Sequence, residues 1–129
     1  MTTLKGQCEC GAVAFEVNNP RQEVTFCHCS QCRRTSGHFW AATNAQFTDV
    51  TFISDNGLKW FESSDFAKRG FCKECGSSLF YRMNGEEDIG IAVGALNQPT
   101  GFKPGNHIFV ADKGDYYDIA DGVPQLDKF

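Results

Sequence analysis

The clearest pattern along the chain is a set of short stretches in which every second residue is apolar. Such a period is typical of strands with one buried face. Val13, Phe15 and Val17 alternate in this way with Ala14 and Glu16. The same reasoning predicts two strands within 4–17, around a turn at 10–11, and further strands over 24–29, 39–43, 50–53, 58–61, 78–83 and 89–93.

Turn-forming residues separate these stretches and leave room for little helix. Asn56-Gly57 stands between two apolar runs and is typical of a hairpin turn. Ser30 is a suitable N-cap for a short helical turn over 31–35, which Gly37 would end. The expected fold is therefore mainly β: a small β-sheet or sandwich-like domain with one or two short helices. Residues from Leu96 onward are rich in glycine, proline and aspartate, and we expect them to wrap the sheet.

Length and composition limit the function classes. At 129 residues, with 41% hydrophobic and 22% charged residues, the chain is expected to form one domain over 1–129. A net charge of −4 argues against general nucleic-acid binding, which needs a basic face. No stretch approaches the roughly 18 apolar residues of a membrane span, and no secretion signal is evident, so we expect a cytoplasmic protein. An exposed strand edge would allow two chains to pair as a homodimer.

Cysteine spacing supplies the candidate chemistry. The seven cysteines fall into three groups with the patterns CxC, CxCxxC and CxxC. An odd number of cysteines in an expected reducing compartment favours metal binding over disulfides. Zinc accepts several closely spaced thiolates in a tetrahedral arrangement. The three groups are Cys8 and Cys10; Cys27, Cys29 and Cys32; and Cys72 and Cys75.

Spacing alone allows two ways of dividing the cysteines between two zinc ions. The first keeps each group intact, and we prefer it for that reason. It gives a closed site of Cys8, Cys10, Cys72 and Cys75 and a second site of Cys27, Cys29 and Cys32. The second gives a closed site of Cys29, Cys32, Cys72 and Cys75 and leaves Cys8, Cys10 and Cys27, with His28 as a further candidate.

The two kinds of site differ in what they can do. A four-cysteine site is closed and stabilises the fold, whereas a three-cysteine site leaves one position for an external ligand. A thiolate-rich site favours another soft donor, so a small-molecule thiol is the expected guest. Zinc would lower the pKa of that thiol and make it a nucleophile at neutral pH.

Four motifs along the chain carry a family resemblance. They are Cys8-x-Cys10-Gly11, Cys27-His28-Cys29-Ser30-x-Cys32-Arg33, Gly70-Phe71-Cys72-x-x-Cys75-Gly76-Ser77 and His107-Ile108-Phe109-Val110. Together they resemble the glutathione-dependent formaldehyde-activating family, which also includes centromere protein V. The resemblance covers nearly the whole chain, and all seven cysteines have matches.

The resemblance implies a zinc-organised β-sheet fold with two zinc ions per chain. It implies a structural zinc on Cys8, Cys10, Cys72 and Cys75 and a catalytic-type zinc on Cys27, Cys29 and Cys32, in agreement with the first division. It also implies a carbon–sulfur lyase-type reaction, in which glutathione and an aldehyde-type electrophile such as formaldehyde combine. The alternative function is a non-catalytic zinc module that carries a thiol or binds another protein.

Charged and titratable neighbours complete the expected site. Arg33 and Arg34 are candidates for binding the carboxylates of glutathione, because guanidinium groups pair with carboxylates through two hydrogen bonds. His28 would point away from the metal in an extended strand and is expected to lie behind the ligands. His38 is the candidate proton carrier, and His107 is expected to be structural. The aspartates between 112 and 121 are interpreted as a solvated tail.

Overall fold

Short strands dominate the structure, as the alternating pattern predicts. The computed structural model describes residues 2–129. Within them the one α-helix is α1 (Ser30–Ser36), and three short 3-10 helices are η1 (Phe47–Asp49), η2 (Val93–Ala95) and η3 (Val110–Asp112). None of these helices is both long and apolar enough to cross a membrane. The strands are β1 (Thr3–Gln7), β2 (Ala14–Asn18), β3 (Glu23–Cys27), β4 (Trp40–Gln46), β5 (Val50–Ser54), β6 (Leu58–Phe61), β7 (Ala67–Cys72), β8 (Ser78–Met83), β9 (Asp88–Ala92) and β10 (Lys103–Ile108).

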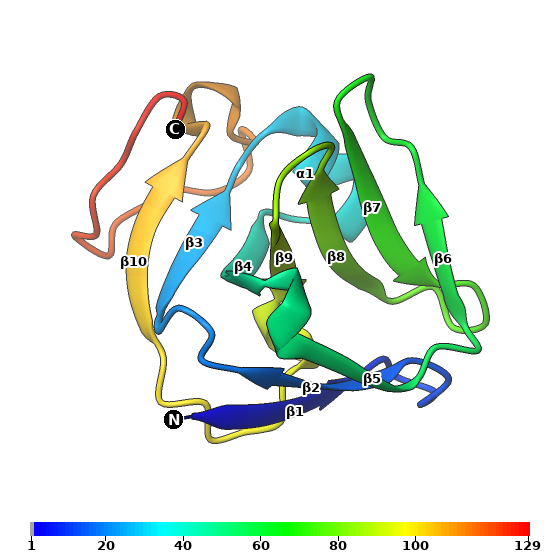
Figure 1. Ribbon diagram of the computed structural model, residues 1–129. Coiled ribbons are helices and arrows are strands. Elements are labelled where there is room, and N and C mark those ends of the chain that lie inside the picture. The colour runs from blue at the N-terminus through cyan, green and yellow to red at the C-terminus, as the bar shows by residue number, and fades with distance from the viewer. Residues whose placement is uncertain (1) are drawn as a thin grey trace. The chain divides into compact units, whose positions relative to one another are not determined.

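The fold divides into two compact units, each made from two separate segments. The first contains the residues up to Arg21 together with Thr43–Thr100, and the second contains Gln22–Ala42 and Gly101–Phe129. In the first unit β1, β2 and β5 form one antiparallel sheet, and β9, β8, β7 and β6 lie side by side in that order (Figure 1). Because the division into two compact units does not test how many domains the chain forms, the expectation of one domain over 1–129 stays a prediction.

An aromatic cluster fills the core of the first unit. Phe80 on β8 lies at its centre, with ring centroids 5.1 Å from Phe15, 5.7 Å from Phe52 and 6.0 Å from Trp60. Val13, Phe15 and Val17 are all fully buried, which confirms the period-two prediction for this stretch. Burial of large aromatic side chains stabilises a small domain strongly, by about 1.5–3 kcal/mol for each phenylalanine.

The second unit contains a strand that the sequence pattern did not reveal. β10 pairs in parallel with β3, and β3 pairs with β4 in antiparallel register. Figure 1 shows β10, in yellow-orange, beside β3, in blue. Pro104 and Gly105 disfavour a strand by propensity, and a register shift between Pro104 and Asn106 accommodates them. The tail thus adds to a sheet in this unit rather than only wrapping one.

A second unpredicted strand is β7, which precedes the CxxC motif. Its sequence, AKRGFC, carries two adjacent cationic residues and a glycine and shows no simple alternation. Pairing on both sides nevertheless holds it extended, with β6 on one edge and β8 on the other. Here tertiary pairing outweighs the weak local preference.

Candidate metal centres

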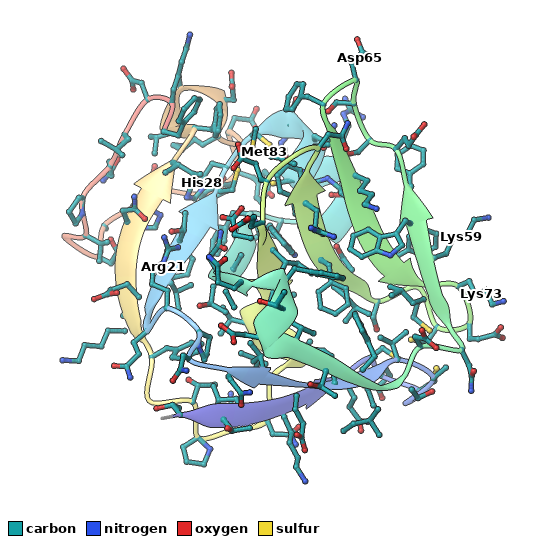
Figure 2. All side chains as sticks on the ribbon, in the orientation of Figure 1. Arg21, His28, Lys59, Asp65, Lys73 and Met83 are labelled. Atoms are coloured by element: carbon teal, nitrogen blue, oxygen red, sulfur yellow. The ribbon has the colours of Figure 1, made fainter. Side chains whose placement is uncertain are left out.

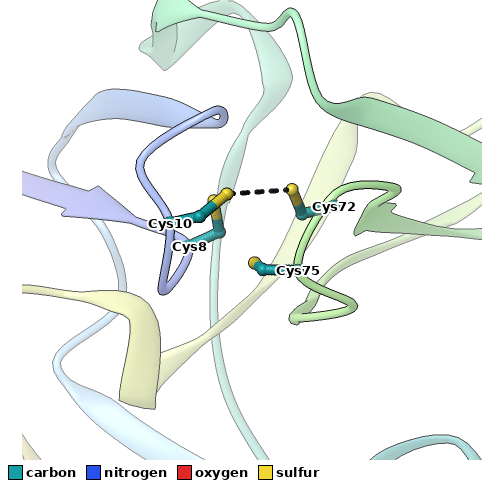
Figure 3. Close-up of side chains that lie close together, drawn as sticks. All are labelled: Cys8, Cys10, Cys72 and Cys75. Carbon is teal, nitrogen blue, oxygen red and sulfur yellow. Dashed lines mark hydrogen bonds between the residues drawn. The ribbon is translucent and has the colours of Figure 1, made fainter.

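Four cysteine sulfurs converge in the first unit from two distant segments. Cys8 and Cys10 follow β1, Cys72 ends β7, and Cys75 lies in the turn before β8 (Figure 3). All four sulfurs lie within 4.8 Å of one another. The Sγ atom of Cys10 is 3.7 Å from that of Cys8 and 3.7 Å from that of Cys72.

These separations fit a tetrahedral zinc site. Zinc–sulfur bonds of about 2.3 Å at tetrahedral angles place sulfurs about 3.8 Å apart. A disulfide would instead join two sulfurs at about 2.05 Å, and all seven cysteines are free thiols. The structure groups the sulfurs as in the first division considered above, because Cys29 and Cys32 lie in a separate cluster. The alternative closed site that joins them to Cys72 and Cys75 is not formed.

Local turns and hydrogen bonds hold the sulfurs of this first cluster. Gly76 adopts a φ of +80°, which residues with a side chain rarely adopt, and this lets the chain turn immediately after Cys75. The Ser77 hydroxyl lies 3.2 Å from the Cys75 sulfur, and the Val13 amide donates to the Cys8 sulfur at 3.3 Å. Hydrogen bonds from the Ser77 side chain and backbone lower the pKa of Cys75 to about 5, so this residue favours the thiolate that a metal needs.

Gly57 packs directly against this first cluster, and we expect Gly57→Ala to destabilise it. A Cβ at this position would lie 2.8 Å from the Cys72 sulfur and 2.8 Å from the Ala12 Cβ, so one of them must move. Overpacking of this kind costs about 1–3 kcal/mol. Urea denaturation measured together with zinc content should show a lower midpoint and weaker zinc retention.

Gly94→Ala is the matched control, because a Cβ at Gly94 meets nothing within 4 Å and no left-handed φ is involved. Its free energy of unfolding should change by no more than about 0.5 kcal/mol. Equal urea midpoints for Gly57→Ala and Gly94→Ala would contradict the close packing of Gly57 on Cys72.

Three further sulfurs converge in the second unit. Cys27 ends β3, Cys29 follows it, and Cys32 lies in the first turn of α1. Their sulfurs lie within 4.8 Å of one another, and within residues 2–129 no fourth cysteine, histidine or carboxylate joins this set. Cys32 is almost fully buried, at 3% exposed. We call these residues the three-cysteine cluster.

Helix α1 is fixed to this cluster by a cysteine rather than by the serine expected from the sequence. The N-cap is Cys29, whose sulfur accepts a hydrogen bond from the Cys32 amide at 3.2 Å, and the expectation of Ser30 as N-cap is wrong. A thiolate can satisfy a free amide at the start of a helix as a hydroxyl does. The helix ends at Gly37, with a φ of +92°, as predicted.

Crowding of the three sulfurs disfavours three negative charges in the absence of a cation. Cys29, Cys32 and burial together raise the pKa of the Cys27 thiol far above its usual range. Three thiolates can be held this close only when a positive charge compensates them. The donor set therefore fits a soft divalent cation such as zinc, with three protein ligands.

His28 lies within the CxCxxC segment but binds other partners. It is fully buried in the second unit (Figure 2). Its Nδ1 atom is 2.6 Å from the Tyr117 hydroxyl, and its Nε2 atom is 2.8 Å from Nδ1 of His107. Burial, followed by the nearby His107 and His38, lowers the pKa of His28 to about 4, so its imidazole is neutral at neutral pH. Both of its ring nitrogens are thus engaged with Tyr117 and His107, and His28 is not part of the three-cysteine cluster.

Residues of the tail also reach this region, which sequence reasoning missed. Asp121 is exposed, in agreement with the interpretation of a solvated tail, but it also accepts a hydrogen bond from His107, which that interpretation did not predict. Tyr117 stacks on the ring of His28, with centroids 5.5 Å apart. His38, the expected proton carrier, bonds through Nδ1 to the Tyr116 hydroxyl at 2.8 Å. The contact of His38 with Tyr116 joins positions 78 residues apart, and that of His28 with Tyr117 joins positions 89 apart, so no local signal reveals them.

Comparison with known proteins decides the family. The sequence model of the glutathione-dependent formaldehyde-activating enzymes matches residues 3–112, which is most of the chain. The chain belongs to this family. An uncharacterized lyase of Schizosaccharomyces pombe is 30% identical over 122 residues, covering 93% of this chain and 88% of the relative.

Two further proteins support this membership. One is from Halomonas elongata and is provisionally named a glutathione-dependent formaldehyde-activating enzyme. It is 32% identical over 90 residues, and the match spans 60% of this chain but only about half, 54%, of that relative. The other is a Rhodobacter sphaeroides protein of known crystal structure, with 25% identity and a TM-score of 0.62 over 95% of this chain and 98% of that one.

In this member of the glutathione-dependent formaldehyde-activating enzyme family, the two candidate arginines lie on α1, close to the three-cysteine cluster. Both are in the last turn of the helix. The Nε atom of Arg33 is buried and has no hydrogen-bond partner among residues 2–129, whereas Arg34 is exposed. A buried donor without a partner in the chain is open to a hydrogen bond with a water or another group from outside.

Proposed function

We propose that the protein is a zinc-dependent lyase-type enzyme of carbon–sulfur chemistry that joins glutathione to a small electrophile such as formaldehyde, or releases it. Membership of the family, together with relatives named as a lyase and a formaldehyde-activating enzyme, supports a glutathione-related, lyase-like function. In the proposal the first cluster, of Cys8, Cys10, Cys72 and Cys75, stabilises the fold. The chemistry takes place at the three-cysteine cluster.

One observation carries this assignment. The three-cysteine cluster offers three sulfurs, and the described residues 2–129 supply no fourth ligand within the same distance. A zinc site with three protein ligands keeps a position for substrate, whereas a site with four does not. When bound there, zinc acts as a Lewis acid and lowers the pKa of a thiol in the free position.

The reaction proposed for this site needs no oxidant or reductant. Addition of the glutathione thiol to formaldehyde breaks the S–H bond and the carbonyl π bond and forms one sulfur–carbon bond. The thiol proton ends on the new hydroxyl group of S-hydroxymethylglutathione. With zinc bound, the three cysteines would fix the position that the glutathione sulfur takes, which would lower the entropic cost of the encounter.

Arg33 and Arg34 are the groups proposed to bind glutathione itself. The tripeptide carries two carboxylates, and a guanidinium pairs with a carboxylate through two parallel hydrogen bonds. The buried, unsatisfied Nε of Arg33 makes this side chain the stronger candidate of the two. The exposed Arg34 would contribute mainly long-range attraction, which salt weakens.

A calorimetric titration of the zinc-loaded protein tests the proposal. We expect glutathione to bind and S-methylglutathione to bind at least about tenfold more weakly, because methylation removes the thiol that would fill the free position. Formaldehyde added to the glutathione complex should then give S-hydroxymethylglutathione, which carbon-13 NMR detects.

Each other result of the titration points to a different function. Equal affinity for the two compounds would mean that the tripeptide portion alone is recognised, and the role of the free thiol would be wrong. Tight binding of glutathione without turnover of any aldehyde would favour a thiol carrier. Failure of both compounds to bind would overturn the assignment of glutathione as co-substrate.

A further inference from the structure

Residues 124–128 lie along β10 in the second unit, and we call them the strap. Figure 1 shows this part of the chain, in red, beside β10. The His107 amide donates to the Pro124 carbonyl at 2.8 Å, and the Leu126 amide donates to the His107 carbonyl at 2.9 Å. Two further backbone bonds, of 2.7 and 3.0 Å, run from Phe109 to Lys128 and from Val110 to Leu126.

Backbone hydrogen bonds rather than buried side chains hold the strap in place. All of its side chains are exposed, and even Leu126 keeps 42% of its surface in contact with solvent. The ring of the neighbouring Phe129, 5.7 Å from that of Phe109, adds an aromatic contact. A segment with so little buried surface opens more readily than a central strand. The strap also lies beyond residue 112, where the match to the family model ends.

Strand β10 connects the strap to β3, because it pairs with both. Its parallel register with β3 places His107 beside Phe26 and Ile108 beside Cys27. The two strands stay in contact past the end of β3, where the His28 amide donates to the Ile108 carbonyl at 3.0 Å. On the other side of Cys27, the Phe26 ring stacks on the His107 imidazole, with centroids 4.9 Å apart. β10 therefore supports the chain on both sides of Cys27.

The three-cysteine cluster depends on how the end of β3 is placed. Cys27 ends β3, and Cys29 follows it as the N-cap of α1. Their sulfurs and that of Cys32 lie within 4.8 Å of one another. Metal–sulfur bonds of about 2.3 Å tolerate displacements of only about 0.2 Å. Groups that support a ligand therefore affect how tightly the site binds its cation.

We propose that the strap is a positioning segment for the three-cysteine cluster. Docked on β10, it holds β3 and Cys27 in the geometry that binds a soft divalent cation, and its release loosens this site alone. The first cluster takes its ligands from the other unit and is not affected. This inference rests on the proposed function only for the cation that the cluster binds. The hold of the strap on β3 does not depend on that function.

Cadmium-113 NMR of the full-length chain loaded with Cd²⁺ tests the proposal, because each cluster should give its own signal. Leu126→Pro removes the amide that donates to His107. We expect the signal of the three-cysteine cluster to shift or broaden, and its affinity for Cd²⁺ to fall at least about tenfold. The signal of the first cluster should stay in place. Cys27→Ser removes the second signal and thereby assigns the two.

Leu126→Ala and Gln125→Pro are the matched controls. The first shortens the same side chain but keeps the amide. The second places a proline at an amide that donates no hydrogen bond to any of residues 2–129. Both should keep the two cadmium signals. Unchanged signals in Leu126→Pro, an equal effect of Leu126→Ala, or an equal change at the two clusters would each overturn the proposal.

Hydrogen exchange of the His28 amide tests the hold of the strap on β3 without any metal signal. Loosening of β10 in Leu126→Pro should speed this exchange about fivefold, the factor expected for the loss of one hydrogen bond. The Cys72 amide, which donates to the Ser77 carbonyl at 3.0 Å in the first unit, should exchange at an unchanged rate. An unchanged rate for His28 would refute the hold of the strap on β3.

The two experiments distinguish failure of this inference from failure of the proposed function. Two cadmium signals with the expected effect of Leu126→Pro, but no binding of glutathione, would refute the proposed function and leave the role of the strap intact. A single cadmium signal in the unmodified protein would refute both the cation at the three-cysteine cluster and the proposed function. Exchange of the His28 amide would then decide whether the strap holds β3.

Discussion

Cys72→Ser is expected to remove one zinc ion from each chain and to destabilise the first unit by about 5 kcal/mol or more. Cys72 is fully buried, and its sulfur lies 3.7 Å from that of Cys10. Because such a site does not exist in the unfolded chain, the free energy of metal binding contributes directly to folding, and it amounts to about 10–16 kcal/mol in small zinc domains. Metal analysis by mass spectrometry and urea denaturation measure the two effects.

The control for this change is Glu74→Ala, which alters an exposed residue between Cys72 and Cys75. Its free energy of unfolding should stay within about 0.5 kcal/mol of the unmodified protein. If Cys72→Ser kept the full zinc content and the same urea midpoint, the structural role of the first cluster would be refuted.

Cys27→Ser is expected to have the opposite profile, with chemistry lost and the fold retained. The variant should lose the second zinc ion and keep the first, because the two clusters share no ligand. Changes in groups that merely support metal ligands reduce activity 10- to 100-fold, so loss of a ligand should reduce formation of S-hydroxymethylglutathione by at least about 100-fold. Zinc content, circular dichroism and carbon-13 NMR of the product report the three properties separately.

Ser30→Ala is the comparison for Cys27→Ser, since Ser30 is exposed at the start of α1 beside the cluster. It should retain two zinc ions and full turnover. Turnover by Cys27→Ser at the rate of this control would mean that the reaction takes place elsewhere, and the three-cysteine cluster would not be the active centre.

The sequence predicted those parts of the fold and of the sites that depend on residues close together in the chain. Alternation at Val13, Phe15 and Val17 predicted a buried strand face because strand geometry places every second residue on one side. The groups CxC, CxCxxC and CxxC predicted two clusters because residues so close in sequence can reach one metal ion. Gly37 predicted the end of α1 because few other residues adopt its backbone conformation readily.

The parts that sequence did not predict depend on contacts between distant positions. β10 contains Pro104 and Gly105, and it forms a strand because β3 offers a partner rather than because its own residues prefer one. The contact between His28 and Tyr117 joins residues 89 positions apart. Asp121 lies in a polar tail whose composition indicates only exposure to solvent. Such contacts require the arrangement of strands, which periodicity alone does not give.

The discontinuous make-up of the two units sets an order for their assembly during synthesis. The first unit has all of its residues once Thr100 has been made, and its four sulfurs are present once Cys75 has been made. The second unit must wait for the tail, which supplies Tyr117 and Asp121. At about 5–20 residues per second, His28 waits on the order of ten seconds for its partner Tyr117. The first cluster can therefore take up its zinc while the nascent chain is still attached to the ribosome, before the second unit is complete.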